Sequence, residues 1–236
     1  MIQYGIIGNP LGHSYSERFF TEKFIREHIN ASYTPYALTQ IDEVEHVLQC
    51  LSGFNVTYPY KESIIPYLDG IDSIANEIGA VNVVSKGKGY NTDWIGFRDS
   101  IVPLLISEDK KALLLGTGGV SKAIQYALRR LNIDYTLVSR QASESAITYD
   151  NISQELLNEH SIIINCTPLG MVPYEKEKPA IPYKWLTSKH LLYDCIYNPA
   201  KTLFLLEGEK YGCRIKNGLE MLHLQANEAW MIWSHQ

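Results

Sequence analysis

The sequence is poor in cysteine, and its four cysteines are not arranged like metal ligands. Cys50, Cys166, Cys195 and Cys213 form no C-x-x-C pair and have no metal-like spacing with a histidine. Isolated cysteines of this kind are typical of cytosolic proteins, in which disulfides are rare. We therefore expect reduced core cysteines, a cytoplasmic location and no bound metal.

The sequence also lacks an excess of positive charge and any long hydrophobic run. Lysine and arginine number 21 against 26 aspartates and glutamates, which gives a net charge of -5. A nucleic-acid-binding protein usually carries a basic stripe, and a membrane-spanning helix needs roughly 20 apolar residues. The first twenty residues already contain Glu17 and Arg18, unlike a signal peptide. We expect neither a nucleic acid nor a membrane as a partner.

What the chain does contain is an alternation of short apolar runs and helical patterns. Such alternation predicts an α/β fold, with mainly parallel sheets covered by helices. The expected strands are 2–7, 33–38, 53–56, 80–84, 112–115, 135–138, 162–165 and 191–193. The expected helices are 16–28, 41–51, 60–68, 94–105, 120–131, 153–159, 202–211 and 218–233.

A polar break at 107–111 separates two rounds of this alternation. The chain has 236 residues and is 45% hydrophobic, which suits one large or two small domains at roughly 100–200 residues per domain. We therefore predict two α/β domains with a boundary near 95–110. A proline-rich segment at 168–182 is expected to form a loop.

A glycine-rich turn follows the apolar run 112–115. Its residues are Gly116, Thr117, Gly118, Gly119 and Val120, and a helical pattern comes next. Glycines let the backbone approach an anion, and free N–H groups at a helix start face it, so this turn predicts a phosphate cradle. It is not a full G-x-G-x-x-G, and an ordinary strand–helix turn also fits.

The following strand ends at Ser139-Arg140, where a dinucleotide fold meets the adenosine ribose. An arginine at this place suits a 2′-phosphate, whereas an acid suits a free 2′-hydroxyl. The sequence therefore favours NADP over NAD as the cofactor. Taken alone, Arg140 also fits an exposed cation at a strand end.

Small polar side chains stand at strand ends and helix starts of the first half. Ser14 and Ser16 begin one expected helix, Asp93 precedes another, and Asn82 interrupts an apolar run. Two hydroxyls with free helix N–H groups can hold a carboxylate, although serine and aspartate are also common helix caps. Because ligands of open α/β sheets bind beyond the carboxyl ends of strands, we expect these groups to converge on one cleft.

Lys61 and Gln225 each stand at a place where their residue type is unexpected. Pro59 predicts the first turn of a helix, and the positive end of the helix dipole there disfavours Lys61. This pattern fits a catalytic lysine and a solvated surface lysine equally well. Gln225 lies on the apolar side of the last helix and needs a hydrogen-bond partner, which either a ligand or nearby backbone can supply.

Together these motifs resemble the shikimate dehydrogenase family, from residue 5 to about 229. The most specific are Asn55-Val56-Thr57-x-Pro59-x-Lys61 and Asn91-Thr92-Asp93-x-x-Gly96. The others are Gly8-Asn9-Pro10 through His13-Ser14-x-Ser16, Gly79-Ala80-Val81-Asn82, Gly116-x-Gly118-Gly119, Asn165-x-Thr167-Pro168-x-Gly170-Met171, Asp194-x-x-Tyr197-Asn198-Pro199-x-x-Thr202 and Gly218-x-x-Met221-Leu222-x-x-Gln225-Ala226. Two positions depart from the family pattern, because Glu17 stands where a proline is usual and Glu144 where a basic residue is frequent.

The resemblance implies a substrate domain at 1–95, a Rossmann-like NADP domain at 96–212, and a terminal segment, 213–236, whose helix packs back on the first domain. It implies that Lys61 and Asp93 are the catalytic pair. The implied substrate contacts are Ser14, Ser16, Thr57, Asn82, Asp93, Tyr197 and Gln225. The implied cofactor contacts are Gly116, Thr117, Gly118, Gly119, Val120, Ser139, Arg140, Thr167 and Gly218.

By the same resemblance, the expected reaction is the reversible NADP-dependent reduction of 3-dehydroshikimate to shikimate, a step in making chorismate and aromatic amino acids. A monomer or a homodimer is expected. The near alternatives are a relative that acts on quinate as well as shikimate, or on an amino-substituted analogue. A non-catalytic NADP- or shikimate-binding sensor is disfavoured by Lys61 with Asp93, and a methylene-tetrahydrofolate dehydrogenase by the two serines with the Asn-Thr-Asp motif.

Overall fold

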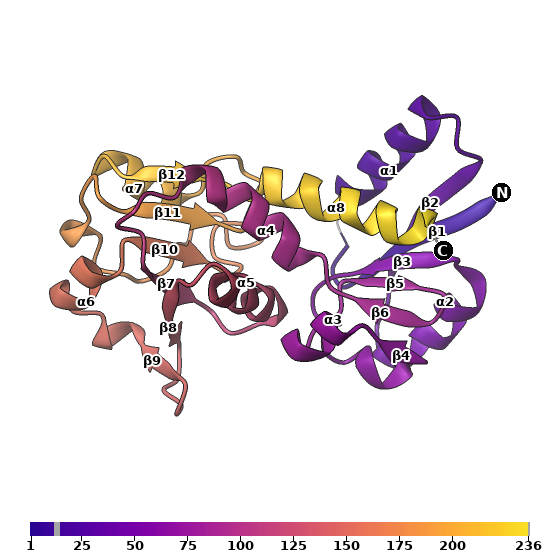
Figure 1. The fold of residues 1–236 in the computed structure, drawn as a ribbon, viewed down its shortest axis with the longest axis horizontal. Coiled ribbons are helices and arrows are strands. Elements are labelled where there is room, and N and C mark those ends of the chain that lie inside the picture. Colours follow the sequence, from indigo (N-terminus) through magenta and orange to yellow (C-terminus); the bar gives the residue numbers. More distant parts are fainter. Residues whose placement is uncertain (12–14, 236) are drawn as a thin grey trace. The chain divides into compact units, whose positions relative to one another are not determined.

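The computed structural model describes residues 1–11 and 15–235, and the chain divides into two compact units. The first unit comprises Met1–Thr92 and Gln225–Gln236, and the second comprises Asp93–Leu224. Each unit is built on a six-stranded sheet with helices packed against it (Figure 1). The predicted α/β class is therefore confirmed.

The sheet of the first unit is mixed, with the strand order β2-β1-β3-β5-β6-β4. The central strand β1 pairs in parallel with β2 and β3, whereas β5 runs antiparallel to both of its neighbours. Its strands are β1 (Ile2–Gly8), β2 (Ala31–Ala37), β3 (Gly53–Val56), β4 (Gly70–Ile71), β5 (Val83–Ser85) and β6 (Lys88–Tyr90).

Helices cover both faces of this sheet. Val44 and Val47 of one helix and Ala75 of another pack on one face, and an aromatic cluster fills the other. In that cluster Trp233 stacks on Tyr4 at 4.8 Å between ring centroids, and its Nε1 donates to the carbonyl of Val84 at 3.0 Å. The helical elements are α1 (Tyr15–Arg26), η1 (Ile41–Glu43), α2 (Val44–Cys50), η2 (Ile65–Tyr67), α3 (Ser73–Ile78) and, from Gln225 on, α8 (Leu219–Ser234).

The sheet of the second unit is parallel throughout, in the order β12-β11-β10-β7-β8-β9. The chain winds outward from β7 to β9, returns to β10 beside β7, and winds outward again to β12. The strand order therefore reverses between β7 and β10, the place where doubly wound folds bind ligands. The strands are β7 (Lys111–Leu115), β8 (Asp134–Ser139), β9 (Ala146–Thr148), β10 (Ile162–Asn165), β11 (Leu191–Asp194) and β12 (Arg214–Lys216).

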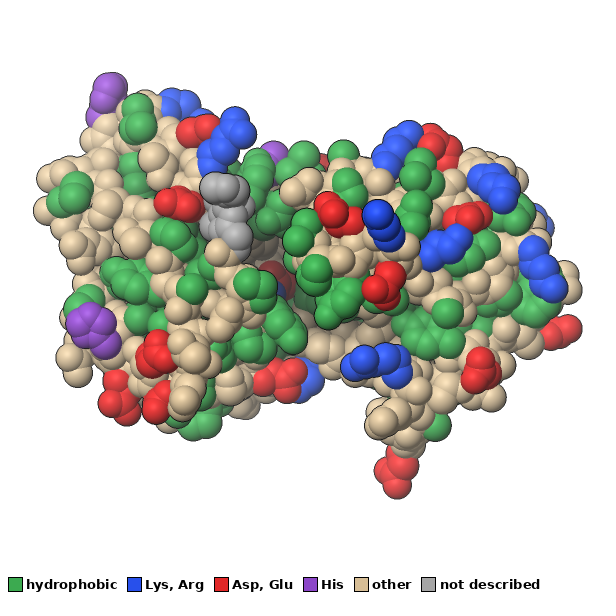
Figure 2. Space-filling model, turned by 180° about the vertical axis from the view of Figure 1, so that it is seen from behind, with side chains coloured by type: hydrophobic (Ala, Val, Ile, Leu, Met, Phe, Trp, Pro, Cys, Tyr) green, Lys and Arg blue, Asp and Glu red, His purple; other side chains and the backbone are tan. Residues whose placement is uncertain are grey.

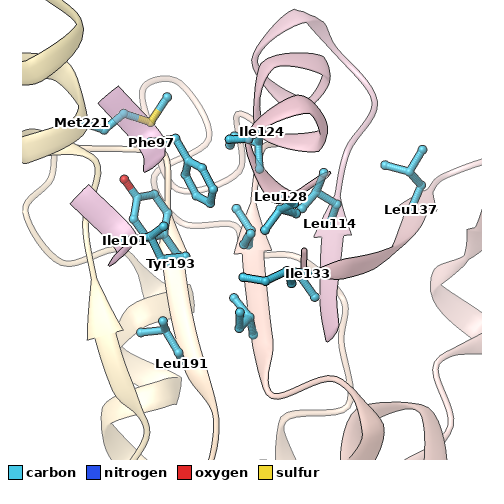
Figure 3. Close-up of a cluster of buried hydrophobic side chains, with 14 of the residues drawn as sticks. Phe97, Ile101, Leu114, Ile124, Leu128, Ile133, Leu137, Leu191, Tyr193 and Met221 are labelled. Atoms are coloured by element: carbon cyan, nitrogen blue, oxygen red, sulfur yellow. The ribbon is translucent and has the colours of Figure 1, made fainter. Parts of the chain in front are cut away.

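Two hydrophobic clusters, one on each face, hold helices to this second sheet. On one face Phe97 and Ile124 pack toward Tyr193 and Leu114, and the rings of Phe97 and Tyr193 meet edge to face at 5.0 Å (Figure 3). The other cluster includes Leu157 and Phe204. The helical elements are α4 (Asp93–Ile101), η3 (Val102–Leu104), α5 (Gly119–Arg130), η4 (Tyr149–Asn151), α6 (Gln154–Glu159), η5 (Tyr183–Trp185) and α7 (Leu203–Lys210).

The predicted helix at 60–68 is wrong. Residues 58–64 form turns, and only Ile65–Tyr67 is helical, as the 3-10 helix η2. Pro66 explains the difference, because it lacks the N–H that a helix would bond to Glu62 and its ring crowds that turn. Lys61 therefore does not stand at a helix start, and the unfavourable dipole placement inferred from the sequence does not exist.

Other differences concern short elements. The strand predicted at 80–84 begins only at Val83, so Asn82 precedes it. The short strands β4, β6, β9 and β12 and the helix α3 were not predicted. These five elements have two to six residues, too few to display a hydrophobic period.

Charged side chains of both signs are interspersed over the face of the molecule shown in Figure 2. Several form exposed pairs within one helix turn, such as Arg18 with Glu22 at 2.7 Å, which contribute little to stability. Within residues 1–11 and 15–235, none of the helices combines the length and the apolar character needed to cross a membrane.

Candidate active site

Three buried polar residues of the first unit, Asn82, Thr92 and Gln225, are hydrogen-bonded to one another. The Nδ2 of Asn82 donates to Thr92 Oγ1 at 3.0 Å and to Gln225 Oε1 at 3.3 Å, while its Oδ1 accepts from the Thr92 N–H at 2.7 Å. Thr92 Oγ1 donates in turn to the carbonyl of Gln225 at 3.0 Å. The Gln225 amide oxygen thus has a side-chain partner. The chain leaves the first unit at Thr92 and returns at Gln225, so these bonds join the two crossing points.

The network continues along the sheet from Asn82 to the start of α1. Asn55 Nδ2 donates to the carbonyl of Asn82 at 3.3 Å, and the Tyr33 hydroxyl donates to Asn55 Oδ1 at 2.7 Å. Ser16 is hydrogen-bonded to the same Tyr33 hydroxyl. Burial raises the pKa of Tyr33 well above its ordinary value, so this phenol keeps its proton and remains a donor.

The sequence did not suggest Tyr33 or Asn55 as part of the site. A signal existed for Asn55, because an asparagine within an apolar strand is disfavoured and needs partners when buried. Across the described residues, every fully buried side-chain nitrogen or oxygen has a hydrogen-bond partner. The orientation of each amide in this network is therefore set by its neighbours.

The loop that carries Thr57 and Lys61 is held by its backbone. The Thr57 N–H donates to the carbonyl of Ile7 at 2.9 Å, and the Lys61 carbonyl accepts from Val81 N–H at 2.7 Å. Val56 N–H donates to the carbonyl of Asn82 at 2.9 Å. The hydrogen bond from Val81 fixes the backbone of Lys61 beside the residue that precedes Asn82. The Lys61 side chain is half-buried.

In the second unit, the glycine turn between β7 and α5 has the geometry of an anion cradle. Gly116 has φ of +103°, which only glycine adopts readily, and open space lies where a Cβ of Gly118 would be. The first backbone hydrogen bond of α5 runs from the Lys122 N–H to the Gly118 carbonyl. The N–H groups of 119–121 come before this bond and therefore have no acceptor within the helix. These residues fit a dinucleotide phosphate, which the free N–H groups and the helix dipole would favour.

The other predicted cofactor residues end or follow the strands β8, β10 and β12 of the same parallel sheet. Ser139 ends β8 and is followed by the exposed Arg140, and Thr167 comes just after β10 with its N–H bonded to Asn165 Oδ1 at 3.0 Å. Gly218 follows β12, and any Cβ there would collide with the carbonyl oxygen of Cys195. Because the strands are parallel, the predicted cofactor residues lie at one edge of the sheet, the edge formed by the carboxyl ends of its strands.

Asp194, at the end of β11, organises the loop that carries Tyr197. Its carboxylate accepts from the Ile196 N–H at 3.0 Å, from Asn165 Nδ2 at 3.1 Å and from Thr202 Oγ1 at 2.5 Å. Burial nevertheless raises the pKa of Asp194 from 3.8 to about 6, because desolvation outweighs the three donors. This edge thus offers an ordered set of hydrogen bonds around one buried acid. Metal binding has no support there, since no cluster of three histidine, cysteine or acidic side chains occurs in the described part of the chain.

Comparison with known proteins places these features in a family. A model of the shikimate dehydrogenase substrate binding domain matches residues 6–84. A shikimate dehydrogenase (NADP(+)) of Methanosphaera stadtmanae is 34% identical, over 98% of this chain and 90% of that protein. The chain belongs to the shikimate dehydrogenase family. One from Carboxydothermus hydrogenoformans is 36% identical with the same coverage.

Solved structures of the shikimate dehydrogenase family share the whole fold. The enzyme of Aquifex aeolicus superimposes with a TM-score of 0.88 at 31% identity, over 100% of this chain and 93% of that one. The enzyme of Thermus thermophilus, in complex with NADP(H) and shikimate, gives a TM-score of 0.88 at 26% identity, covering 100% and 94%. Their two-domain architecture confirms the fold expected from the sequence.

The residues expected to bind substrate in this family are distributed as follows. Ser16, Asn82 and Gln225 belong to one hydrogen-bond network of the first unit. Thr57 and Lys61 belong to the same unit. Ser14 lies outside the described residues. Asp93, the first residue of α4, and Tyr197 belong to the second unit, as do all the predicted cofactor residues.

Asp194 leads to a prediction about stability and pH. Its pKa is higher in the folded than in the unfolded chain, so its contribution is fully present below about pH 4 and is lost as the pH rises through about 6. Relative to Asp194→Asn, the unfolding free energy of the wild type should fall by about 3 kcal/mol over this range. Denaturant unfolding of both proteins at pH 3 to 8 measures the difference.

Thr202→Val is the matched variant, because it removes a donor that favours the charged carboxylate. The pH at which stability declines should then move upward, whatever the general cost of losing the Thr202 cap. If the difference in unfolding free energy between the wild type and Asp194→Asn does not change with pH, the pKa of the Asp194 carboxyl is not raised in the folded protein.

Proposed function

We propose that this protein catalyses the reversible reduction of 3-dehydroshikimate to shikimate, with NADP as its cofactor. The observation that carries the proposal is near-full-length similarity to shikimate dehydrogenases (NADP(+)), at 34% identity over 98% of the chain. The reaction belongs to the biosynthesis of chorismate and aromatic amino acids. We place the enzyme in the cytoplasm, as a monomer or a homodimer.

In this proposal, residues 1–95 form the substrate domain, 96–212 the NADP domain, and 213–236 the segment whose helix packs on the first. Ser14 and Ser16 bind the substrate carboxylate, helped by the N–H groups at the start of α1. Support for the binding of ring hydroxyls comes from the fixed amides of Asn82 and Gln225, since preorganised donors and acceptors need no reordering when a ligand arrives. Thr57, Asp93 and Tyr197 are the remaining substrate contacts.

The cofactor is held by Gly116, Thr117, Gly118, Gly119 and Val120 around its phosphates. Arg140 and Ser139 contact the ribose 2′-phosphate, and Thr167 and Gly218 line the rest. When bound, NADPH supplies the hydride. Negative charge then builds on the ring oxygen, and the Lys61 ammonium stabilises it and donates a proton from Nζ. Asp93 orients Lys61 and bonds the reacting hydroxyl, and in the oxidising direction Lys61 takes the proton back.

The experiment that tests this function is a parallel assay of the purified protein. Shikimate and quinate are each offered with NADP and with NAD, and cofactor reduction is followed at the nicotinamide absorbance. We expect the highest kcat/KM with shikimate and NADP. Comparable rates with quinate would identify a broader enzyme, and the absence of turnover with every pair, despite bound NADP, would identify a sensor.

Lys61→Ala should lower kcat by about 100-fold to 10,000-fold, the usual contribution of a positioned proton donor. KM for shikimate should change little, because the lost interaction belongs to the transition state. Lys88→Ala is the control, since Lys88 is an exposed lysine of the same unit. An unchanged kcat in Lys61→Ala would refute the catalytic role.

Arg140→Ala should raise the KM for NADP about tenfold to a hundredfold, because a charge-assisted phosphate contact is worth about 1.5–3 kcal/mol. The KM for NAD should stay nearly the same, since NAD has no 2′-phosphate. Arg130→Ala, at an exposed arginine of α5 in the same unit, serves as the control. Equal losses with both cofactors would mean that Arg140 does not read the phosphate.

A further inference from the structure

Cys166 and Cys195 directly follow two adjacent parallel strands of the second unit. β10 and β11 pair with Asn165 opposite Asp194, so the two cysteines are the next residues on each strand. The Cys195 N–H donates to the carbonyl of Asn165 at 3.0 Å, which keeps the backbones together at this point. The register therefore places these residues side by side, although 28 positions separate them in the sequence.

The side chains of the pair also point the same way. Both pack against the hydrophobic cluster that contains Tyr193, so they lie on the same face of the sheet. Both residues are half-buried free cysteines, within reach of a small oxidant. The other two cysteines lie elsewhere, since Cys50 ends α2 in the first unit and the Cys213 thiol donates to the carbonyl of Thr187.

This arrangement is close to that of a disulfide. Neighbouring strands run about 4.7–4.9 Å apart, and bridged cysteines usually have Cα atoms about 4.4–6.8 Å apart. Because both side chains lie on the same face of the sheet, the two sulfur atoms need only approach to bonding distance. A bridge between Cys166 and Cys195 thus requires a local adjustment of the chain, not a rearrangement of the sheet.

The backbone of each cysteine touches a glycine assigned above to the cofactor. A Cβ on Gly116 would lie 3.3 Å from the carbonyl of Cys166, and one on Gly218 would collide with the carbonyl of Cys195. Thr167, also assigned to the cofactor, follows Cys166 directly. These contacts leave no free space between the backbone of the two cysteines and the two glycines. Drawing the cysteines together therefore shifts the backbone that would hold NADP.

We propose that Cys166 and Cys195 are a reversible oxidation site, and that the disulfide form binds NADP more weakly than the dithiol form. The first half concerns the thiols alone. The second half rests on the function proposed above.

The chemistry requires a peroxide as the oxidant. The neighbouring Cys166 side chain and burial raise the pKa of the Cys195 thiol, so we assign the first reaction to the Cys166 thiol. Its sulfur takes one oxygen from hydrogen peroxide, which gives a sulfenic acid and one water. The Cys195 sulfur then attacks the Cys166 sulfur, the S–S bond forms, and the hydroxyl leaves with the Cys195 proton as a second water. Two electrons and two protons pass to the peroxide, and a dithiol reductant returns them.

The test treats the purified full chain with hydrogen peroxide and then removes the oxidant. We expect two of the four thiols to disappear from a thiol titration under denaturing conditions. The intact mass should fall by about 2 Da, and peptide mapping should recover a Cys166–Cys195 linked peptide. The dissociation constant for NADP, measured by calorimetry, should rise about tenfold and return to its starting value after reduction with dithiothreitol.

Variants assign the effect to this pair. In Cys166→Ser and Cys195→Ser, peroxide should yield no internal bridge and leave each variant's own NADP affinity unchanged, with alanine at the same positions as a second choice if serine impairs folding. Cys50→Ser and Cys213→Ser should respond like the wild type. Four remaining thiols, or a bridge that involves Cys50 or Cys213, would overturn the proposal.

A Cys166–Cys195 bridge with unchanged NADP affinity would overturn its second half. If the reduced protein does not bind NADP at all, the proposed function fails, while the thiol titration still decides whether the bridge forms. The two ideas can thus fail separately.

Discussion

The polar residues of the first unit depend on the hydrogen bonds of the buried Asn82. They join Thr92, where the chain leaves that unit, to Gln225, where it returns, and the Asn82 carbonyl accepts from Asn55. A buried amide that loses a partner costs about 1–3 kcal/mol, so each member depends on the orientation of the next. Through Asn55 and Tyr33 the constraint reaches Ser16 at the start of α1. Three of the residues proposed to bind the substrate, Ser16, Asn82 and Gln225, therefore belong to one preorganised group.

The sequence predicted the second unit better than the first, for a physical reason. Strands such as β7 and β10 are buried on both faces, so they appear in the sequence as continuous apolar runs between helical patterns. In the first unit, β4 and β6 are two or three residues long and carry no such signal. The helix predicted at 60–68 failed at Pro66, whose missing N–H outweighed the apolar pattern. Local sequence patterns predict elements that are long and uninterrupted. They miss short elements that are stabilised only by pairing in the folded structure.

The candidate site shows the same division. Ser16, Asn82 and Gln225 could each be noticed as polar residues at unusual places, but a bond such as Asn82 to Gln225 joins positions 143 residues apart and has no local signature. Lys61 was noticed for a reason that the structure removes, because no helix begins beside it. Its proposed role now rests on the Asn-Val-Thr-x-Pro-x-Lys motif and on a backbone bond to Val81, beside Asn82. A broken local rule was therefore a poor guide here, whereas the long motifs led to the family that the comparisons show.

The cysteines illustrate why an edge of a parallel sheet gathers chemistry that the sequence disperses. Spacing in the sequence shows no C-x-x-C pair. In a parallel sheet, however, the residues that follow neighbouring strands become neighbours across the ladder, whatever the length of the crossover between them. Glycines 116 and 218, Asp194 and the two thiols follow or end such strands at the edge where the strand order reverses. A disulfide between these cysteines would displace backbone that lies against Gly116 and Gly218. A thiol pair placed there is therefore coupled to the proposed cofactor site by direct contact.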